Sequence, residues 1–233
     1  MDMKISGSGA VSGGEYDNIK SSGTVRMCGT VKCTSLKSSG TARGEKLVCT
    51  GTVRTSGSAK FTGEVRARDL KTSGTFLAND LEASTVTASG KFIINGQIKV
   101  TEINAQGSFK ACEDIEAENV ELCGKVVCCG LLNAENTVIK FSRGTEIGSI
   151  GGGKIELTRE KLLFIALPFR VAKISSAIEG DEIKLDHVTA PRVTGRSIII
   201  GAGCKIELLE YSESCEIDKR AIVKHTKRVG IDT

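Results

Sequence analysis

The sequence contains no tryptophan, only two prolines and only two histidines, and aromatic residues make up 4% of its 233 residues. The shortage of histidine leaves little general acid–base chemistry for an enzyme. The longest apolar stretch, LLFIALPFRV at residues 162–171, is far shorter than the roughly 20 residues of a membrane-spanning helix. We therefore expect neither a transmembrane helix nor a catalytic protein.

The opening segment, MDMKISGSGA, lacks the basic stretch and apolar run of a signal peptide, so we expect a cytoplasmic protein. Nine cysteines in such a reducing compartment behave mostly as small buried hydrophobes. The net charge of +4 is too small by itself to argue for a nucleic-acid partner, and none is expected.

Glycine, by contrast, is abundant, and it recurs at a nearly constant interval along the chain. The members of this series are Gly23, Gly40, Gly57, Gly74, Gly90, Gly107 and Gly124. Their regularity predicts a repeat of about seventeen residues, with a turn at each glycine.

Three ladders of apolar residues follow at the same interval, which gives each repeat three faces. The first ladder comprises Val25, Ala42, Ala59, Phe76, Phe92, Phe109 and Val126. The second comprises Val31, Val48, Val65, Leu81, Ile98, Ile115 and Leu132. The third comprises Leu36, Val53, Leu70, Val86, Ile103, Val120 and Val138.

A small residue often lies two positions beyond a large one, as at Ala67, Ala78, Ala83, Ala88, Ala105, Ala111, Ala117, Ala134, Cys33 and Cys128. This period of two predicts short strands whose side chains point alternately inward and outward. It disfavours a leucine-rich or helical solenoid. The sequence therefore predicts an all-β fold, a parallel three-sided β-helix (solenoid) with about 17 residues per coil.

The segment SIGGGK interrupts the spacing near residue 150. We therefore predict a β-helix body at 1–150, an insertion or connecting segment at 151–175, and further coils with a C-terminal cap at 176–233. In the last region β spacing resumes at Ile183, Leu185, Val188, Val193, Ile198, Ile200, Ile206, Leu208 and Tyr211. Ile183 and Ile200 are again one repeat length apart.

The apolar insertion has two interpretations. It is expected to form a strand pair or helical turn that covers an edge of the β-helix. Alternatively, it is a docking segment for a membrane or partner, because Arg159, Lys161, Arg170 and Lys173 flank the apolar run. In the second interpretation the docking side chains are those of Leu163, Phe164 and Phe169.

Charge also follows the repeat. One basic series comprises Lys20, Lys37, Arg54 and Lys71, and another comprises Arg26, Arg43 and Lys60. A later acidic group comprises Glu113, Asp114, Glu116, Glu118 and Glu121. Such charges keep exposed edges soluble, or the basic region of one copy attracts the acidic region of another copy, or an anionic surface, in a salt-dependent manner. Lys20, Lys37, Arg54 and Lys71 are the candidates for docking to a membrane or partner.

No motif predicts a catalytic centre, a cofactor site or a metal site. His187 and His225 lie in no recognisable nucleophile motif and are interpreted as surface residues. The spacing of Cys112, Cys123, Cys128 and Cys129 is not that of a zinc ribbon. Gly151–Gly153 are turn glycines, because no phosphate-binding motif surrounds them.

The opening ISGSGAVSGGEYDNIKSSGTV, the repeated SGT and SGS turns, and the later segments IEGDEIKLDHVTAPRVTG and YSESCEID together resemble the bactofilins, bacterial polymer-forming cytoskeletal proteins, in their longer Firmicute-type form. The resemblance covers nearly the whole chain. It implies a right-handed β-helix that polymerises without nucleotide. It also implies cytoplasmic filaments or sheets, often near the membrane, that position cell-envelope machinery.

The resemblance agrees with a physical argument, since an uncapped β-helix end offers an open hydrogen-bonding edge for coaxial assembly. We expect a non-enzymatic scaffold that associates with itself through Val11, Tyr16 and Ile19, with a membrane surface or cell-envelope proteins as candidate partners. A monomeric binding or sensor module is the alternative. A hexapeptide-type acyltransferase fits less well, because it requires strict hexapeptide steps and a catalytic histidine between coils.

Overall fold

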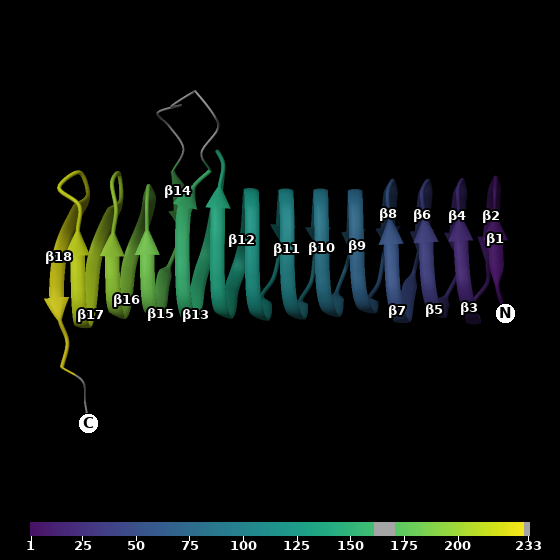
Figure 1. The fold of residues 1–233 in the computed structure, drawn as a ribbon, viewed down its shortest axis with the longest axis horizontal. Coiled ribbons are helices and arrows are strands. Elements are labelled where there is room, and N and C mark those ends of the chain that lie inside the picture. Colours follow the sequence, from purple (N-terminus) through teal and green to yellow (C-terminus); the bar gives the residue numbers. More distant parts are fainter. Residues whose placement is uncertain (161–170, 231–233) are drawn as a thin grey trace. The chain divides into compact units, whose positions relative to one another are not determined.

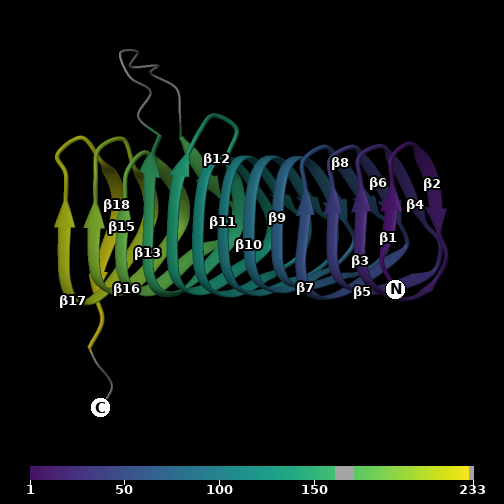
Figure 2. The same ribbon diagram turned by 45° about the vertical axis from the view of Figure 1, so that its right-hand side comes forward.

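The computed structural model describes residues 1–160 and 171–230, and every element in this part of the chain is a β-strand. Strands account for 79% of the structure. The chain divides into two compact units, residues 1–113 and 114–233. Each unit is a stack of coils joined by parallel strand pairing (Figures 1 and 2). The predicted all-β solenoid is therefore confirmed in both units.

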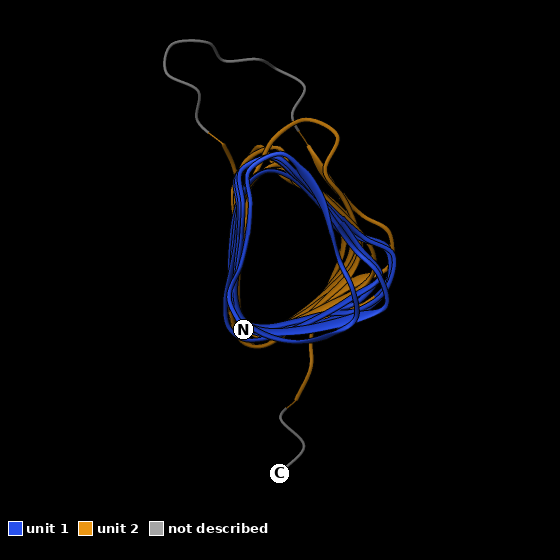
Figure 3. Ribbon diagram, turned by 90° about the vertical axis from the view of Figure 1, so that its right-hand side faces the viewer, with its two compact units in different colours: residues 1–113 blue, residues 114–233 orange. Residues whose placement is uncertain are grey.

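Unit 1 contains eleven strands, and its coils outline a triangle when they are viewed end-on in Figure 3. The strands are β1 (Met3–Ile5), β2 (Ser8–Val11), β3 (Gly14–Ser21), β4 (Thr24–Met27), β5 (Thr30–Ser38), β6 (Thr41–Gly44), β7 (Lys46–Thr55), β8 (Ser58–Phe61), β9 (Val65–Ala78), β10 (Leu81–Ile94) and β11 (Ile98–Ala111). Equivalent residues of adjacent coils pair in register, for example Val86 with Ile103. The predicted repeat is thus the length of one turn.

Unit 2 is built in the same way from seven strands. They are β12 (Ile115–Phe141), β13 (Glu146–Arg159), β14 (Ala172–Ile174), β15 (Ala177–Leu185), β16 (Val188–Ile200), β17 (Lys205–Ile217) and β18 (Ile222–Arg228). β13 pairs with both β14 and β15, and β15, β16, β17 and β18 follow in parallel order. The chain therefore resumes coiling directly after the segment at 161–170.

The core of unit 1 consists of columns of inward-pointing side chains, one on each face of the coils. The most regular of these columns contains phenylalanine rings. Phe76, Phe92 and Phe109 pair in register from coil to coil, and Phe61 contacts Phe76 from a position two residues beyond Ala59, the residue that pairs with Phe76. The ring centroids of Phe76 and Phe92 are 5.3 Å apart with an interplanar angle of 12°, and those of Phe92 and Phe109 are 5.5 Å apart. In-register pairing turns the predicted ladder into a continuous stack of rings.

A second inward column is polar. Ser21, Ser38, Thr55 and Thr72 are buried at equivalent positions in successive coils. The hydroxyl of Thr55 donates to that of Thr72 at 2.9 Å, whereas the hydroxyl oxygens of Ser21 and Ser38 have no partner in the described residues. Each of these small side chains lies two residues before a glycine of the regular series.

The glycine column is required by the close approach of neighbouring backbones. A Cβ atom added at Gly23, Gly40 or Gly57 would lie 2.1–2.2 Å from the carbonyl oxygen of the preceding glycine in the column. At Gly74, Gly90 and Gly107 the backbone is in addition left-handed, with φ between 106° and 120°. Only glycine fits these positions, which explains the regular series in the sequence.

Four details of the predicted ladders are wrong. Leu47, not Val48, is the buried residue that pairs with Val31. Thr137, not Val138, is buried and pairs with Ile155. Ile183 pairs with Ile198 instead of Ile200, so this coil is shorter than the common repeat. In the same region Leu209 is buried and Leu208 only half-buried.

The predicted boundary at residue 150 lies inside β13, whose pairing with β15 continues through Ile150 and Gly151. The predicted insertion at 151–175 includes the second half of β13 and the whole of β14. Leu163, Phe164 and Phe169 lie outside the described residues. The proposed docking role of these three side chains therefore stays a prediction.

Candidate functional site

A column of five cations runs along one face of unit 1, on β1, β3, β5, β7 and β9. The sequence identified four of them, Lys20, Lys37, Arg54 and Lys71, and the structure adds Lys4, which pairs in register with Lys20. All five side chains are exposed, and none forms an ion pair with a carboxylate in the described part of the chain. We call this set the lysine column. Like charges directly opposite on paired strands repel one another, so the column is electrostatically unfavourable in the isolated chain.

A second set of cations lies on the next face, on β4, β6 and β8. Arg26 pairs in register with Arg43, and Arg43 pairs with Lys60. These three exposed side chains line a groove of about 690 Å³. We call it the arginine groove.

Other cations of the same region are paired. Residues 1–77 contain twelve Lys and Arg residues against six Asp and Glu residues. Eight of the twelve belong to the lysine column or the arginine groove, and the other four each contact a carboxylate: Lys32 with Glu15 at 3.1 Å, Lys46 with Glu64 at 2.8 Å, Arg66 with Glu82 at 3.2 Å and Arg68 with Asp69 at 3.0 Å. The excess positive charge is therefore concentrated at two places.

The outward edge of β2, in the first coil, pairs with no strand of the described residues. Thr24 donates its backbone N–H group to the carbonyl oxygen of Gly7 in the first coil. Ser8 pairs with Thr24, and Ala10 lies two positions further on with the same orientation, so the N–H groups of Ser8 and Ala10 point away from the second coil. Within residues 1–160 and 171–230, β2 pairs with β4 alone.

The three residues predicted for self-association lie near this edge, but not at equivalent depths. Val11 belongs to the first coil, points inward and is 1% exposed. Tyr16 is half-buried, and its hydroxyl donates to the carbonyl oxygen of Ser12 at 3.0 Å. Ile19 is fully buried in the second coil, where Met3 of the first coil pairs with it. Backbone edge groups therefore offer more to a partner than the side chains of Val11 and Ile19.

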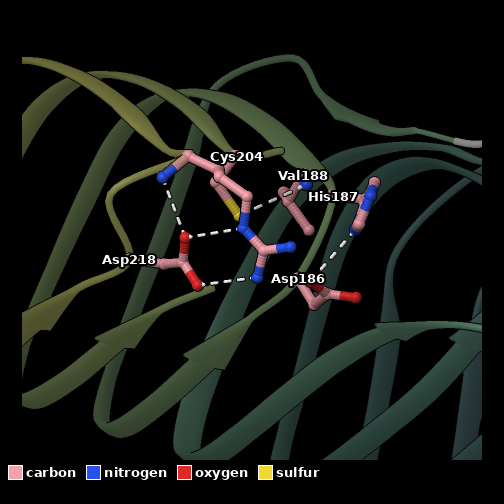
Figure 4. A network of polar contacts seen from close by, with 6 residues as sticks. Asp186, His187, Val188, Cys204 and Asp218 are labelled. Atoms are coloured by element: carbon pink, nitrogen blue, oxygen red, sulfur yellow. Dashed lines mark hydrogen bonds and ion pairs between the residues drawn. The ribbon is translucent and has the colours of Figure 1, made fainter. Parts of the chain in front are cut away.

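The arrangement closest to a catalytic group lies in unit 2 around His187 (Figure 4). His187 has a left-handed backbone, with φ of 55°, and its Nδ1 atom lies 3.0 Å from Oδ1 of Asp186. This contact lacks hydrogen-bond geometry, since Nδ1 is left without a hydrogen-bond partner in the described residues. The imidazole packs beside Gly203, where an added Cβ would lie 2.8 Å from the ring.

Cys204, the thiol of this neighbourhood, is fully buried. Its Sγ accepts the backbone N–H of Val188 at 3.5 Å. Burial raises the pKa of Cys204 to about 11, so the thiol stays protonated at neutral pH. Nearby, a hydrogen bond from Arg220 lowers the pKa of Asp218 to about 2. The arrangement thus provides a packed turn and supplies no activated nucleophile.

The other cysteines do not converge on a metal centre. None of the nine forms a disulfide; Cys33, Cys49, Cys128 and Cys204 are buried, and Cys28 and Cys129 are exposed. In the described residues no group of three or more His, Cys, Asp or Glu side chains could hold a metal ion. The pairing of Cys33 with Cys49 in adjacent coils is part of the inward ladder.

Comparison with known proteins gives two partial similarities. The chain is 35% identical over 103 residues to uncharacterized protein YhbE of Bacillus subtilis (strain 168), which is 43% of this chain and 44% of YhbE. It is 32% identical over 101 residues to uncharacterized protein YhbF of the same strain, which is 43% of this chain and 42% of YhbF. The chain thus spans less than half the length of each relative.

No protein-family model matches the chain, and no solved structure matches it. The described residues include no helix long and apolar enough to cross a membrane.

Four members of the lysine column were predicted correctly from their spacing, but Lys4 and the groove were missed. Lys4 could have been found, because it precedes Lys20 by the same interval that separates Gly74 from Gly90 in the glycine series. The groove could not, because it depends on how the turns after β4, β6 and β8 are shaped.

Proposed function

We propose that this chain is a non-enzymatic scaffold that associates with itself, as the resemblance to the bactofilins implies, and that positions partners at a surface. The observation that carries the proposal is the outward edge of β2, which pairs with no strand of the described residues and where Ser8 and Ala10 direct N–H groups away from the second coil. A second copy can extend the stack there by strand addition. The absence of an activated nucleophile around His187 and Cys204 favours a scaffold over an acyltransferase.

Electron microscopy of the purified chain without nucleotide tests the proposal. We expect filaments or sheets from the wild type and their loss in Ala10→Pro, because proline removes the outward N–H group without removing a bond to the second coil. Ala10 is exposed, so the substitution creates no cavity. Ala10→Ser keeps the N–H group and is the matched control, expected to assemble like the wild type.

Uniformly monomeric wild-type protein at high concentration would refute self-association. It would favour the alternative, a monomeric binding or sensor module. The two unpaired sets of cations support that alternative, because they provide binding surfaces that need no assembly.

The lysine column is the surface that we assign to partner docking, with an anionic membrane as the partner. We expect the chain to cosediment with vesicles that contain anionic lipid and not with neutral vesicles. Substitution of Lys20, Lys37, Arg54 and Lys71 by Gln should weaken binding by at least about tenfold, since each cation near such a surface contributes roughly 1 kcal/mol. Equal binding of this variant and the wild type would contradict the assignment.

A further inference from the structure

We infer that the arginine groove is a binding site for a linear anion that carries repeated phosphate groups. The site is formed by Arg26, Arg43 and Lys60 on β4, β6 and β8 and is distinct from both the strand edge and the lysine column. It requires no self-association. The inference therefore stands or falls separately from the proposed scaffold function.

The first argument is the arrangement of charge. The three cations are in register on adjacent strands, about 4.8 Å apart along the stack, and have no carboxylate partner in the described residues. Cations outside the two sets in residues 1–77 are all paired with acids. A bound polyanion would remove the mutual repulsion that the isolated chain leaves uncompensated.

The second argument is the shape and chemistry of the groove. It is concave, with a volume of about 690 Å³, and Thr24 and Thr62 line it together with the cations. Neither threonine hydroxyl has a hydrogen-bond partner in the described structure, so both are available to phosphate oxygens. Glu45 is the carboxylate of the lining, and its Oε2 accepts the backbone N–H of Gly29 at 3.1 Å.

The third argument concerns the class of ligand. Guanidinium groups and hydroxyls suit phosphate oxygens, and a row of three cations suits a polymer more than a single ion. Sequence-tolerant binding of single-stranded nucleic acid normally adds exposed aromatic rings on which bases stack. Here Phe61 and Phe76 are fully buried, and no aromatic side chain of the described residues lines the groove. The groove therefore fits a phosphate chain without stacking bases.

Calorimetric titration with short inorganic polyphosphate tests the inference across a salt series. We expect binding to weaken with salt, with a slope of about −2 for log K against log salt concentration, as three neutralised charges on a single chain imply. Arg26→Gln, Arg43→Gln and Lys60→Gln combined should reduce affinity at least tenfold and bring the slope close to zero. Titrations in the Ala10→Pro background keep the result independent of assembly.

A matched triple variant carries Lys32→Gln, Lys46→Gln and Arg66→Gln. It loses the same net charge in the same unit, but at cations that are already paired. We expect it to bind within about threefold of the wild type. The Gln variant of the lysine column should likewise keep the groove's affinity.

Equal losses in the groove triple and the matched triple would overturn the inference, because net charge alone would then explain binding. Equal affinity for polyglutamate would refute the phosphate class. Tighter binding of single-stranded DNA with the same number of phosphates would also refute it, since bases would then contribute. The midpoint temperature of thermal unfolding of the variant with all three groove substitutions should be no lower than that of the wild type. The substituted side chains are exposed, and their replacement by Gln removes repulsion between like charges.

Discussion

Substitution of Gly57 by alanine is expected to lower the free energy of unfolding of unit 1 by about 3 kcal/mol. The added Cβ atom would lie 2.1 Å from the carbonyl oxygen of Gly40. That oxygen also accepts the backbone N–H of Ser58 at 3.0 Å, so the coils cannot separate at this point without loss of a hydrogen bond. The measurement is urea unfolding, together with hydrogen exchange of the amides in β8.

Gly7→Ala is the control for this prediction. Gly7 occupies the same column in the first coil, but nothing in the described residues lies within 4 Å of an added Cβ atom. Alanine there restricts the unfolded chain and is expected to change stability by no more than about 0.5 kcal/mol, in the stabilising direction. Equal stability of Gly57→Ala and Gly7→Ala would contradict the claim that backbone contact between coils requires the glycine column.

The fold itself could be predicted because in-register stacking makes every coil repeat the same environment. A glycine that touches the preceding glycine, and an inward residue that touches its counterpart, must recur at the length of one turn. The mean interval between equivalent residues therefore predicts the length of a coil and, with it, the fold. A local change of register is not visible in this mean interval, because a shorter coil and a longer coil compensate for each other.

Val48 is an example of a residue that a constant interval wrongly predicts to point inward. The step from Val31 to its partner Leu47 is shorter than the mean repeat, and the step from Leu47 to its partner Val65 is longer. Two equal steps would place Val48 between Val31 and Val65, and Val48 is also apolar. One residue fewer separates Arg43 from Lys46 than separates Arg26 from Thr30, and this shorter turn before β7 places Leu47 opposite Val31. No feature of the apolar pattern marks it.

The coil at 183–198 shows a different ambiguity. Ile198 and Ile200 both point inward, so a slip of two positions keeps every side chain on its own face. Periodicity of two cannot distinguish the pairing of Ile183 with Ile198 from a pairing with Ile200. Lys173 pairs with Thr189 but Ala177 pairs with Arg192, so a local change of one residue within β16 shifts the register.

The candidate surfaces differ in the same way: a constant interval predicts the lysine column but does not predict the contact groups at the N-terminal edge. Outward residues at a constant interval form columns whatever the turns do, so the lysine column followed from spacing. The side chains of Val11 and Ile19 are predicted to contact a second copy, but apolar side chains of a coil face the interior, and both are buried. The groups at that end that point away from the second coil are backbone N–H groups, whose exposure composition does not reveal.

Substitution of Phe76 by alanine is expected to destabilise unit 1 by about 4 kcal/mol. The ring is fully buried and lies between Phe61, at a centroid distance of 6.0 Å, and Phe92, at 5.3 Å. Its removal therefore leaves a cavity in the middle of the stack and breaks two ring contacts. Neighbouring coils are fixed by their hydrogen-bond ladders, so they cannot collapse into the space.

Two control variants separate the cavity from other effects. Phe76→Leu fills most of the space without the ring contacts and is expected to lose less than half as much stability. Leu77→Ala changes the neighbouring, half-buried residue and should lose less than about 1 kcal/mol. Urea unfolding of the three variants measures the differences. If Phe76→Ala lost no more than Leu77→Ala, the phenylalanine stack would not be a main source of stability, and the hydrogen-bond ladders would have to hold unit 1 together.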